Sequence, residues 1–157
     1  MFFDIGGSMD DYIHECEQLF AAARTEFKHL EFFYFHNCLY DHVWKDNLRR
    51  SSSRMSTWDL MHTYGKDYRV IFVGDASMAP YELMSRGGSV EYMNDEPGNI
   101  WLQRMRHHFT KTAWLNPEND SYWHYTQTIA AIKHIFEDKM FPMTLKGIED
   151  MTRYLSR

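Results

Sequence analysis

The chain has 157 residues, of which 44% are hydrophobic and 17% aromatic, and its formal net charge is −5. This composition excludes a disordered chain and favours one domain of ordinary size with its own core. Because acids and bases alternate and no basic tract occurs, we expect no nucleic acid partner. No window approaches the roughly 20 apolar residues of a membrane-spanning helix, so we expect no membrane partner and a cytoplasmic protein.

The ends of the chain and its cysteines bear on its context. We expect residues 1–157 to form a single domain taken from a longer polypeptide, because Phe2 and Phe3 resemble the tail of a buried strand. Cys16 and Cys38 lie far apart in apolar segments without a CxxC motif. Two reduced, packed thiols are therefore expected.

The first half of the chain predicts strands, a long helix and a hairpin. Apolar residues recur at three- and four-residue steps from Met9 to Ala23, which predicts an amphipathic helix. Short aromatic or apolar runs predict strands at 2–5, 30–36 and 39–44, the last two forming a hairpin that turns at Asn37. Residues 45–56 are polar and serine-rich and predict a loop. A short helix is expected to start near Thr57 and end at Gly65.

The second half predicts alternating strands and helices. The run YRVIFVG at 68–74 is typical of a strand buried on both faces of a parallel sheet. Further strands are predicted at 112–115 and 140–143, and helices at 80–86, 100–109, 122–136 and 145–155, the last with Thr144 as its cap.

This order of elements predicts the fold class. It indicates an α/β protein, a three-layer Rossmann-like sandwich with a mostly parallel central sheet and one antiparallel edge strand. Ligands of such folds bind outside the carboxyl ends of the strands. Asp4 and Asp75 each follow a predicted strand directly, so we expect both carboxylates at that edge.

Oxygen-bearing side chains gather at this predicted edge. Ser8 lies on the turn after Asp4, and Thr57 follows the polar loop. Two carboxylates and two hydroxyls form a donor set that suits a hard cation such as Mg²⁺, which prefers oxygen ligands and retains several waters. Mn²⁺ and Ca²⁺ remain alternatives.

These residues resemble the motifs of a known family. The stretch DIGGSM, from Asp4 to Met9, is similar to the DxSxS motif of the von Willebrand factor type A (VWA) domain. Thr57 and Asp75 resemble its lone metal-binding Thr and its third-motif Asp, in the family's order. The resemblance implies a metal-ion-dependent adhesion site (MIDAS) at Asp4, Ser8, Thr57 and Asp75. Gly6 departs from the pattern, because the family usually has a serine ligand there.

A narrower resemblance concerns one branch of the family. The segments FFYFHNCLYDHVW, VGDASMAPYE, WLNP and MFPMTLKG are similar to the CoxE-like bacterial branch. This likeness implies a VWA domain at the C-terminal end of a longer protein that works with a MoxR-type AAA+ ATPase in maturing or remodelling other proteins. It also implies a non-enzymatic module whose bound ion takes an Asp or Glu carboxylate from a protein partner.

Each site residue also has a purely structural interpretation. Ser8 with Asp11 forms a plausible capping pair at a helix start. Thr57 has the chemistry of a helix N-cap, and Asp75 that of a residue capping its own loop.

The histidines and the arginine cluster are the other residues that could form a site. His107 and His108 are adjacent on a predicted helix and point about 100° apart, and His36 and His42 lack a third ligand, which argues against zinc. The cluster Arg49, Arg50 and Arg54 indicates either a solvated loop or a flank of the crevice that meets an acidic partner.

Two other functions remain open. The missing hydroxyl at Gly6 allows a metal-free scaffold that docks onto an ATPase. A Mg²⁺-dependent phosphotransfer or phosphatase domain would use Asp75 or Asp4 as the nucleophile, but the phosphatase pattern needs an acid where Gly6 stands. No GxxxxGK[ST] motif occurs, so the chain is not itself the ATPase.

Overall fold

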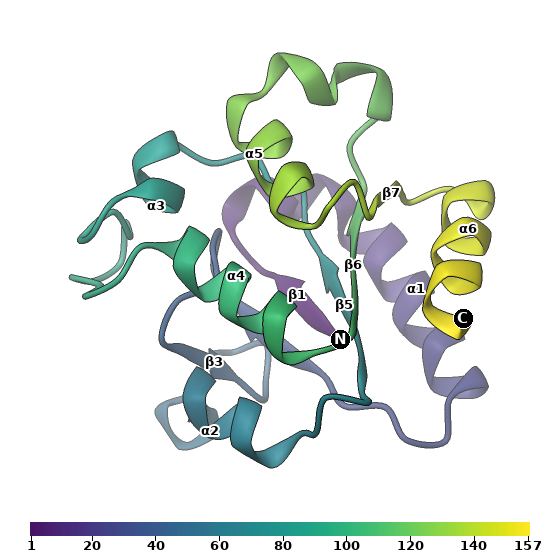
Figure 1. Ribbon diagram of the computed structural model, residues 1–157, viewed down its shortest axis with the longest axis horizontal. Coiled ribbons are helices and arrows are strands. Elements are labelled where there is room, and N and C mark those ends of the chain that lie inside the picture. Colours follow the sequence, from purple (N-terminus) through teal and green to yellow (C-terminus); the bar gives the residue numbers. More distant parts are fainter.

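The computed structural model describes the backbone of residues 1–157 and every side chain except that of Glu26. Within these residues, one seven-stranded sheet has the order β4-β3-β2-β1-β5-β6-β7 (Figure 1). Its strands are β1 (Phe2–Asp4), β2 (Phe33–Phe35), β3 (His42–Trp44), β4 (Arg54–Ser56), β5 (Arg69–Val73), β6 (Lys111–Asn116) and β7 (Met140–Pro142).

The sheet is mostly parallel. The strands β2, β1, β5, β6 and β7 pair in parallel along their order. The antiparallel member is β3, which pairs with β2 through Tyr34 and Trp44. The short strand β4 pairs with β3 and forms the outer edge. The expectation of a loop over the whole of 45–56 was therefore wrong at its end, because three residues are too few for a visible strand pattern.

The helices complete an α/β fold, as predicted. The α-helices are α1 (Ile13–Glu26), α2 (Thr57–Thr63), α3 (Pro80–Met84), α4 (Gly98–His108), α5 (Gln127–Ile135) and α6 (Leu145–Ser156). Three 3₁₀ segments are η1 (Gly7–Tyr12), η2 (Ser51–Ser53) and η3 (Asp120–Tyr125). The region 122–136, expected as one helix, is η3 followed by α5, with Thr126 between them. Thr144 caps α6 as predicted, since its hydroxyl accepts from the Gly147 N–H.

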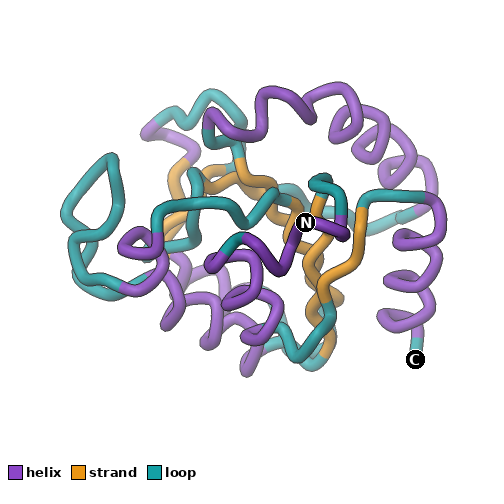
Figure 2. The backbone as a smooth tube through the Cα atoms, turned by 90° about the horizontal axis from the view of Figure 1, so that it is seen from above, coloured by secondary structure: helices purple, strands orange, loops and turns teal.

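Two apolar clusters fill the space between three layers. One cluster joins the sheet to α2, α3, α4 and α5 and includes Leu60, Leu83, Leu102 and Ile129. The other joins the opposite face to α1 and α6, through Phe20 and Leu155 among others. The strands accordingly run between helices in both views (Figures 1 and 2). The cysteines are free, Cys38 buried and Cys16 half-buried.

The high aromatic content packs across the central strands. Phe33, Phe2 and Phe72 are neighbours in register on β2, β1 and β5, with ring centroids 5.3 and 4.9 Å apart. Trp114 on β6 continues the row and lies nearly parallel to Phe72 at 5.5 Å. Such cross-strand aromatic pairs stabilise a sheet beyond the area that they bury. The row holds β1 and β5 side by side.

Candidate functional site

Asp4 and Asp75 lie together at the carboxyl edge of the two central strands. Asp4 is the last residue of β1, and Asp75 follows β5 after Gly74. Each of the two residues is only 4% exposed. Because β1 and β5 are parallel neighbours, their ends bring the two acids to one place, as the sequence predicted.

The loop that carries Asp75 is fixed from β6. The indole Nε1 of Trp114 donates to the Gly74 carbonyl oxygen at 2.8 Å, and Asn116 Nδ2 donates to that of Asp75, also at 2.8 Å. A Cβ on Gly74 would stand 2.9 Å from Asp4 Cβ. Glycine is therefore required here for β1 and the Asp75 loop to approach.

Asp4 is held by backbone donors and surrounded by other acids. Its Oδ1 accepts from the N–H groups of Gly6 at 2.8 Å and Asn37 at 2.9 Å. Burial above all, together with the negative charges of Asp75 and Glu82, raises the pKa of Asp4 to about 7 against these two hydrogen bonds. Among the described side chains, no ion pair joins a basic residue to any of these three acids.

Ser8 reaches Asp75 from η1. Burial raises the pKa of Asp75, opposed by the hydrogen bond from the Ser77 N–H, 3.0 Å from Oδ1, and by the nearby Ser8 hydroxyl. The Asp75 N–H in turn donates to Met9 Sδ at 3.2 Å. The segment after β1 and the loop after β5 are therefore joined at Met9, with Ser8 beside the Asp75 carboxylate.

Thr57 stands close to a different part of this edge. It is fully buried at the first position of α2. Its hydroxyl donates to the Tyr40 carbonyl oxygen at 2.7 Å, and its N–H donates to that of Asp41 at 2.8 Å. The Thr57 hydroxyl is thus tied to the loop between β2 and β3, whereas Asp4 lies close enough to Asp75 for the charge of Asp75 to raise its pKa.

The capping interpretations of Ser8 and Thr57 were wrong. The N-cap of η1 is Gly6, without a side-chain hydrogen bond, and Ser8 lies inside η1. The N-cap of α2 is Ser56, whose hydroxyl accepts from the Asp59 N–H at 3.0 Å. Asp75 does accept from Ser77 N–H, which is the loop-capping role considered for it.

Two residues beside the site have strained backbones. Asn37 has φ 59°, and the hydrogen bond from Cys38 N–H to the His36 carbonyl oxygen, 2.7 Å, closes a three-residue γ-turn around it. Ala76, directly after Asp75, has φ 56°. Positive φ is costly for most residues with a Cβ, less so for Asn than for Ala.

Asn37 and Glu82 belong to this edge but were not predicted as site residues. Asn37 Nδ2 donates to Glu82 Oε1 at 2.9 Å, and Glu82, 5% exposed, accepts from the Ala79 N–H through Oε2 at 3.0 Å. Asn37 was recognised only as a turn residue, and Glu82 is the third residue of the short helix α3. The capping spacing Ala79-x-x-Glu82 was the one signal for a fixed carboxylate there.

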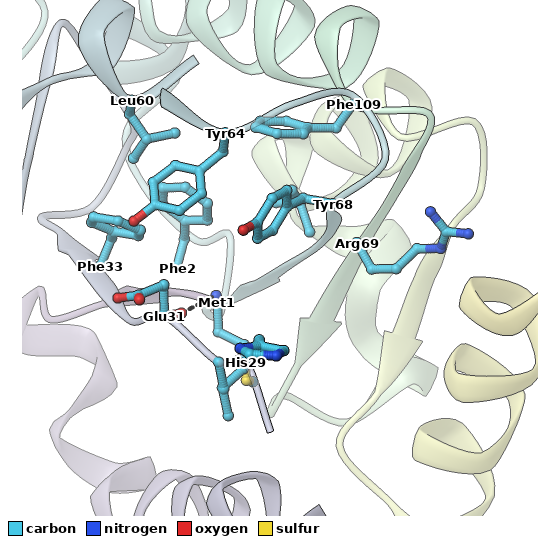
Figure 3. Close-up of a pocket in the computed structure, with 12 residues that line it drawn as sticks. Met1, Phe2, His29, Glu31, Phe33, Leu60, Tyr64, Tyr68, Arg69 and Phe109 are labelled. Atoms are coloured by element: carbon cyan, nitrogen blue, oxygen red, sulfur yellow. Dashed lines mark hydrogen bonds between the residues drawn. The ribbon is translucent and has the colours of Figure 1, made fainter. Parts of the chain in front are cut away.

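A cavity lies at the opposite, amino-terminal edge of the sheet (Figure 3). It measures about 60 Å³, and aromatic rings including Phe2, Phe33, Tyr64 and Tyr68 line it. In Figure 3 the Met1 amino group donates to the Glu31 carbonyl oxygen, at 2.7 Å, beside it. Neither Asp4 nor Asp75 lines this cavity, so it is separate from the candidate site.

The histidines form separate pairs. His36 Nε2 lies 3.6 Å from Glu91, and His42 Nδ1 lies 2.7 Å from Asp41. His108 Nε2 is 2.9 Å from the Tyr64 carbonyl oxygen. Within the described side chains, no three His, Cys, Asp or Glu residues assemble into a metal-binding group.

The arginine cluster is partly engaged. Arg49 pairs with Glu91 at 2.5 Å and stacks over Trp44, so it ties the hairpin to the loop after α3 and is not simply a solvated side chain.

The donor set at Asp4, Ser8 and Asp75 fits a hard cation, because all of its atoms are oxygens and its buried charges are negative. Glu118, after β6, adds an acid whose pKa is raised by burial and then by the charge of Asp75.

No protein-family model, curated protein or solved structure matches the chain. No helix in the described part of the chain has the length and apolar character to cross a membrane.

Proposed function

We propose that this chain is a VWA-like binding module, not an enzyme, that holds a divalent cation through Asp4, Ser8 and Asp75. Thr57 joins this set through a lone pair of its hydroxyl oxygen, since the hydroxyl proton is donated to the Tyr40 carbonyl oxygen. Mg²⁺ is the first choice, with Mn²⁺ and Ca²⁺ as alternatives. The observation that carries the proposal is the pair of adjoining carboxylates, both 4% exposed, with no basic partner among the described side chains. Buried charge without compensation is costly, and a cation between Asp4 and Asp75 removes that cost.

The ligand of such a site is a carboxylate. Mg²⁺ keeps part of its water shell when few protein groups bind it. An Asp or Glu oxygen of a protein partner replaces one of these waters, and the loops around the ion set its direction. From the resemblance to the CoxE-like branch, we further propose that the module acts in the cytoplasm with a MoxR-type AAA+ ATPase in protein maturation or remodelling.

The test is the effect of metal on thermal unfolding. A ligand of the folded state stabilises it by about 2.7 kcal/mol at a concentration 100 times its Kd. For a chain of this length the melting temperature then rises by about 5–10 °C. We expect this shift with Mg²⁺ or Mn²⁺ in the wild type and its loss in Asp75→Asn, which removes the charge but keeps the shape.

Asp67→Asn is the matched control, because Asp67 is exposed in the loop before β5, at the other edge of the sheet. It should retain the full metal-induced shift. Melting curves of the wild type that metal and chelator leave unchanged would contradict the proposal. They would favour a metal-free docking scaffold, the second candidate, which the absence of a hydroxyl at Gly6 supports.

A further inference from the structure

The position where the VWA motif has a serine is filled from another strand end. A Cβ built on Gly6 would overlap Asn37 Oδ1 and would lie 3.1 Å from Asp4 Oδ1. The Asn37 amide thus occupies the space of a residue-6 side chain, next to the buried carboxylate. A serine at position 6 cannot be accommodated while Asn37 keeps this conformation.

Hydrogen bonds of Asn37 and of its partner Glu82 hold the Asn37 side-chain amide in one orientation. Its backbone N–H donates to Asp4 Oδ1 at 2.9 Å, and its Nδ2 donates to Glu82 Oε1 at 2.9 Å. Glu82 is fixed in turn, because its Oε2 accepts from Ala79 N–H and its carbonyl oxygen accepts from the Tyr40 hydroxyl at 2.7 Å. With the amide nitrogen directed at Glu82, the amide oxygen is the atom that faces Gly6.

The γ-turn explains how this oxygen reaches the site. Asn is one of the few residues with a Cβ that tolerate positive φ, and φ 59° at Asn37 orients both its N–H and its amide toward the end of β1. An amide oxygen is an ordinary ligand of Mg²⁺, Mn²⁺ and Ca²⁺. It offers the same neutral oxygen chemistry as the serine hydroxyl that position 6 lacks.

We propose that Asn37 supplies the side-chain oxygen ligand that Gly6 does not, and that Glu82 is the positioning residue that orients it. The inference rests on the proposed cation site. In this proposal the oxygen ligand that the VWA motif has at position 6, after β1, comes instead from Asn37, after β2.

The test exchanges the two donors. Asn37→Gly removes the amide while keeping a residue that suits positive φ, so the fold should survive. We expect Mn²⁺ affinity, measured by isothermal titration calorimetry, to fall at least about 10- to 100-fold, because that is the loss when only a partner of a ligand is removed and here a ligand itself is lost. Gly6→Ser alone should lower the melting temperature because its side chain meets Asn37. The double variant should regain Mn²⁺ affinity to within a few-fold of the wild type.

Asn47→Gly is the control, since Asn47 is exposed in the loop after β3; its Mn²⁺ affinity should match that of the wild type. If the wild type binds Mn²⁺, Asp75→Asn abolishes binding, and Asn37→Gly binds as tightly as the wild type, the role of Asn37 is wrong and the site stands. If the wild type itself binds no metal, the proposed function fails. Should Gly6→Ser not fold, Asn37→Gly against Asn47→Gly still decides.

Glu82→Gln tests the positioning role. A glutamine places an N–H₂ group opposite either the Asn37 amide or the Ala79 N–H, so one of the two hydrogen bonds is lost. We expect Glu82→Gln to weaken Mn²⁺ binding when Asn37 is present. When Glu82→Gln is added to Asn37→Gly, we expect no further weakening. Equal losses in both backgrounds would show that Glu82 acts independently of Asn37.

Discussion

At the scale of single residues, opposing effects set the pKa of Asp4. Burial and the charges of Asp75 and Glu82 raise its pKa, and two backbone N–H donors lower it, with a result of about 7. In the unfolded chain the same carboxyl has a pKa near 3.8. The folded protein therefore binds a proton at Asp4 between these values, where the unfolded chain does not.

This difference predicts a pH-dependent stability of the metal-free protein. Because the folded state binds the extra proton, the free energy of unfolding falls as pH rises from about 4 to 7, by up to about 4 kcal/mol from Asp4. The stabilising effect is complete below pH 4 and absent above pH 7. Asp4→Asn, which does not titrate, should lack this contribution.

The measurement is urea unfolding of the wild type and Asp4→Asn at several pH values in the presence of a chelator. Taking the difference between the two proteins cancels the titrating groups that do not interact with Asp4. The wild type should lose stability relative to the variant as the pH rises. A difference that stays constant from pH 4 to 7 would show that Asp4 is not the buried, titrating group described here.

The residues that the sequence predicted correctly are those whose position follows from strand direction. Asp4 and Asp75 end strands of one parallel sheet, so polarity alone places them together. Asn37 and Glu82 could not be predicted as partners, because their hydrogen bond joins residues 45 positions apart through a γ-turn and a short helix. No periodicity in the sequence encodes such a contact.

At the scale of elements, the close packing of β1 against the end of β5 depends on Gly74. A Cβ at this position would lie 2.9 Å from Asp4 Cβ and 3.3 Å from the Trp114 ring, so only glycine leaves room for both side chains. The predicted strand over 68–74 contained the observed β5. A strand pattern does not predict which residues contact a neighbouring strand, so the contact between Gly74 and Asp4 was not predicted. The same limit applies to β4, which three residues form.

Gly74→Ala should therefore disturb the site and the fold together. Overpacking of this kind costs about 1–3 kcal/mol, and a shift of Asp4 should also weaken Mn²⁺ binding. Denaturant unfolding and calorimetric titration measure the two effects. Gly65→Ala is the control, because nothing lies within 4 Å of a Cβ at Gly65. Wild-type stability and affinity in Gly74→Ala would contradict the packing described.

At the scale of the whole molecule, the two apolar clusters and the polar edge are distinct regions. The larger cluster lies beneath α2 to α5, and the carboxylates lie at the ends of the strands. Alternating strands and helices were enough to predict this layered arrangement. The break between η3 and α5 was not predicted; Trp123, whose indole donates to the Glu118 carbonyl oxygen at 2.9 Å, holds η3 against the preceding loop.

Because the regions are distinct, a core substitution should change stability without changing the proposed metal site. Leu102 on α4 is fully buried, so Leu102→Ala should cost about 2–5 kcal/mol in unfolding free energy. The Mn²⁺ affinity of the folded variant should stay at the wild-type value. Leu48→Ala, at a side chain 66% exposed, should change stability by less than about 0.5 kcal/mol. A large loss of affinity in Leu102→Ala would show that core and site are coupled.

The hydrogen bond from the Trp114 indole to the Gly74 carbonyl oxygen gives the protein an intrinsic spectroscopic reporter. The indole proton of a tryptophan resonates in a sparse region of the NMR spectrum, and this one is only 1% exposed and donates to the residue immediately before Asp75. Its chemical shift follows the loop at the end of β5 directly. Occupancy of the carboxylate edge, by a proton, a cation or a partner's side chain, can thus be observed in the unmodified molecule, without a label or an attached dye.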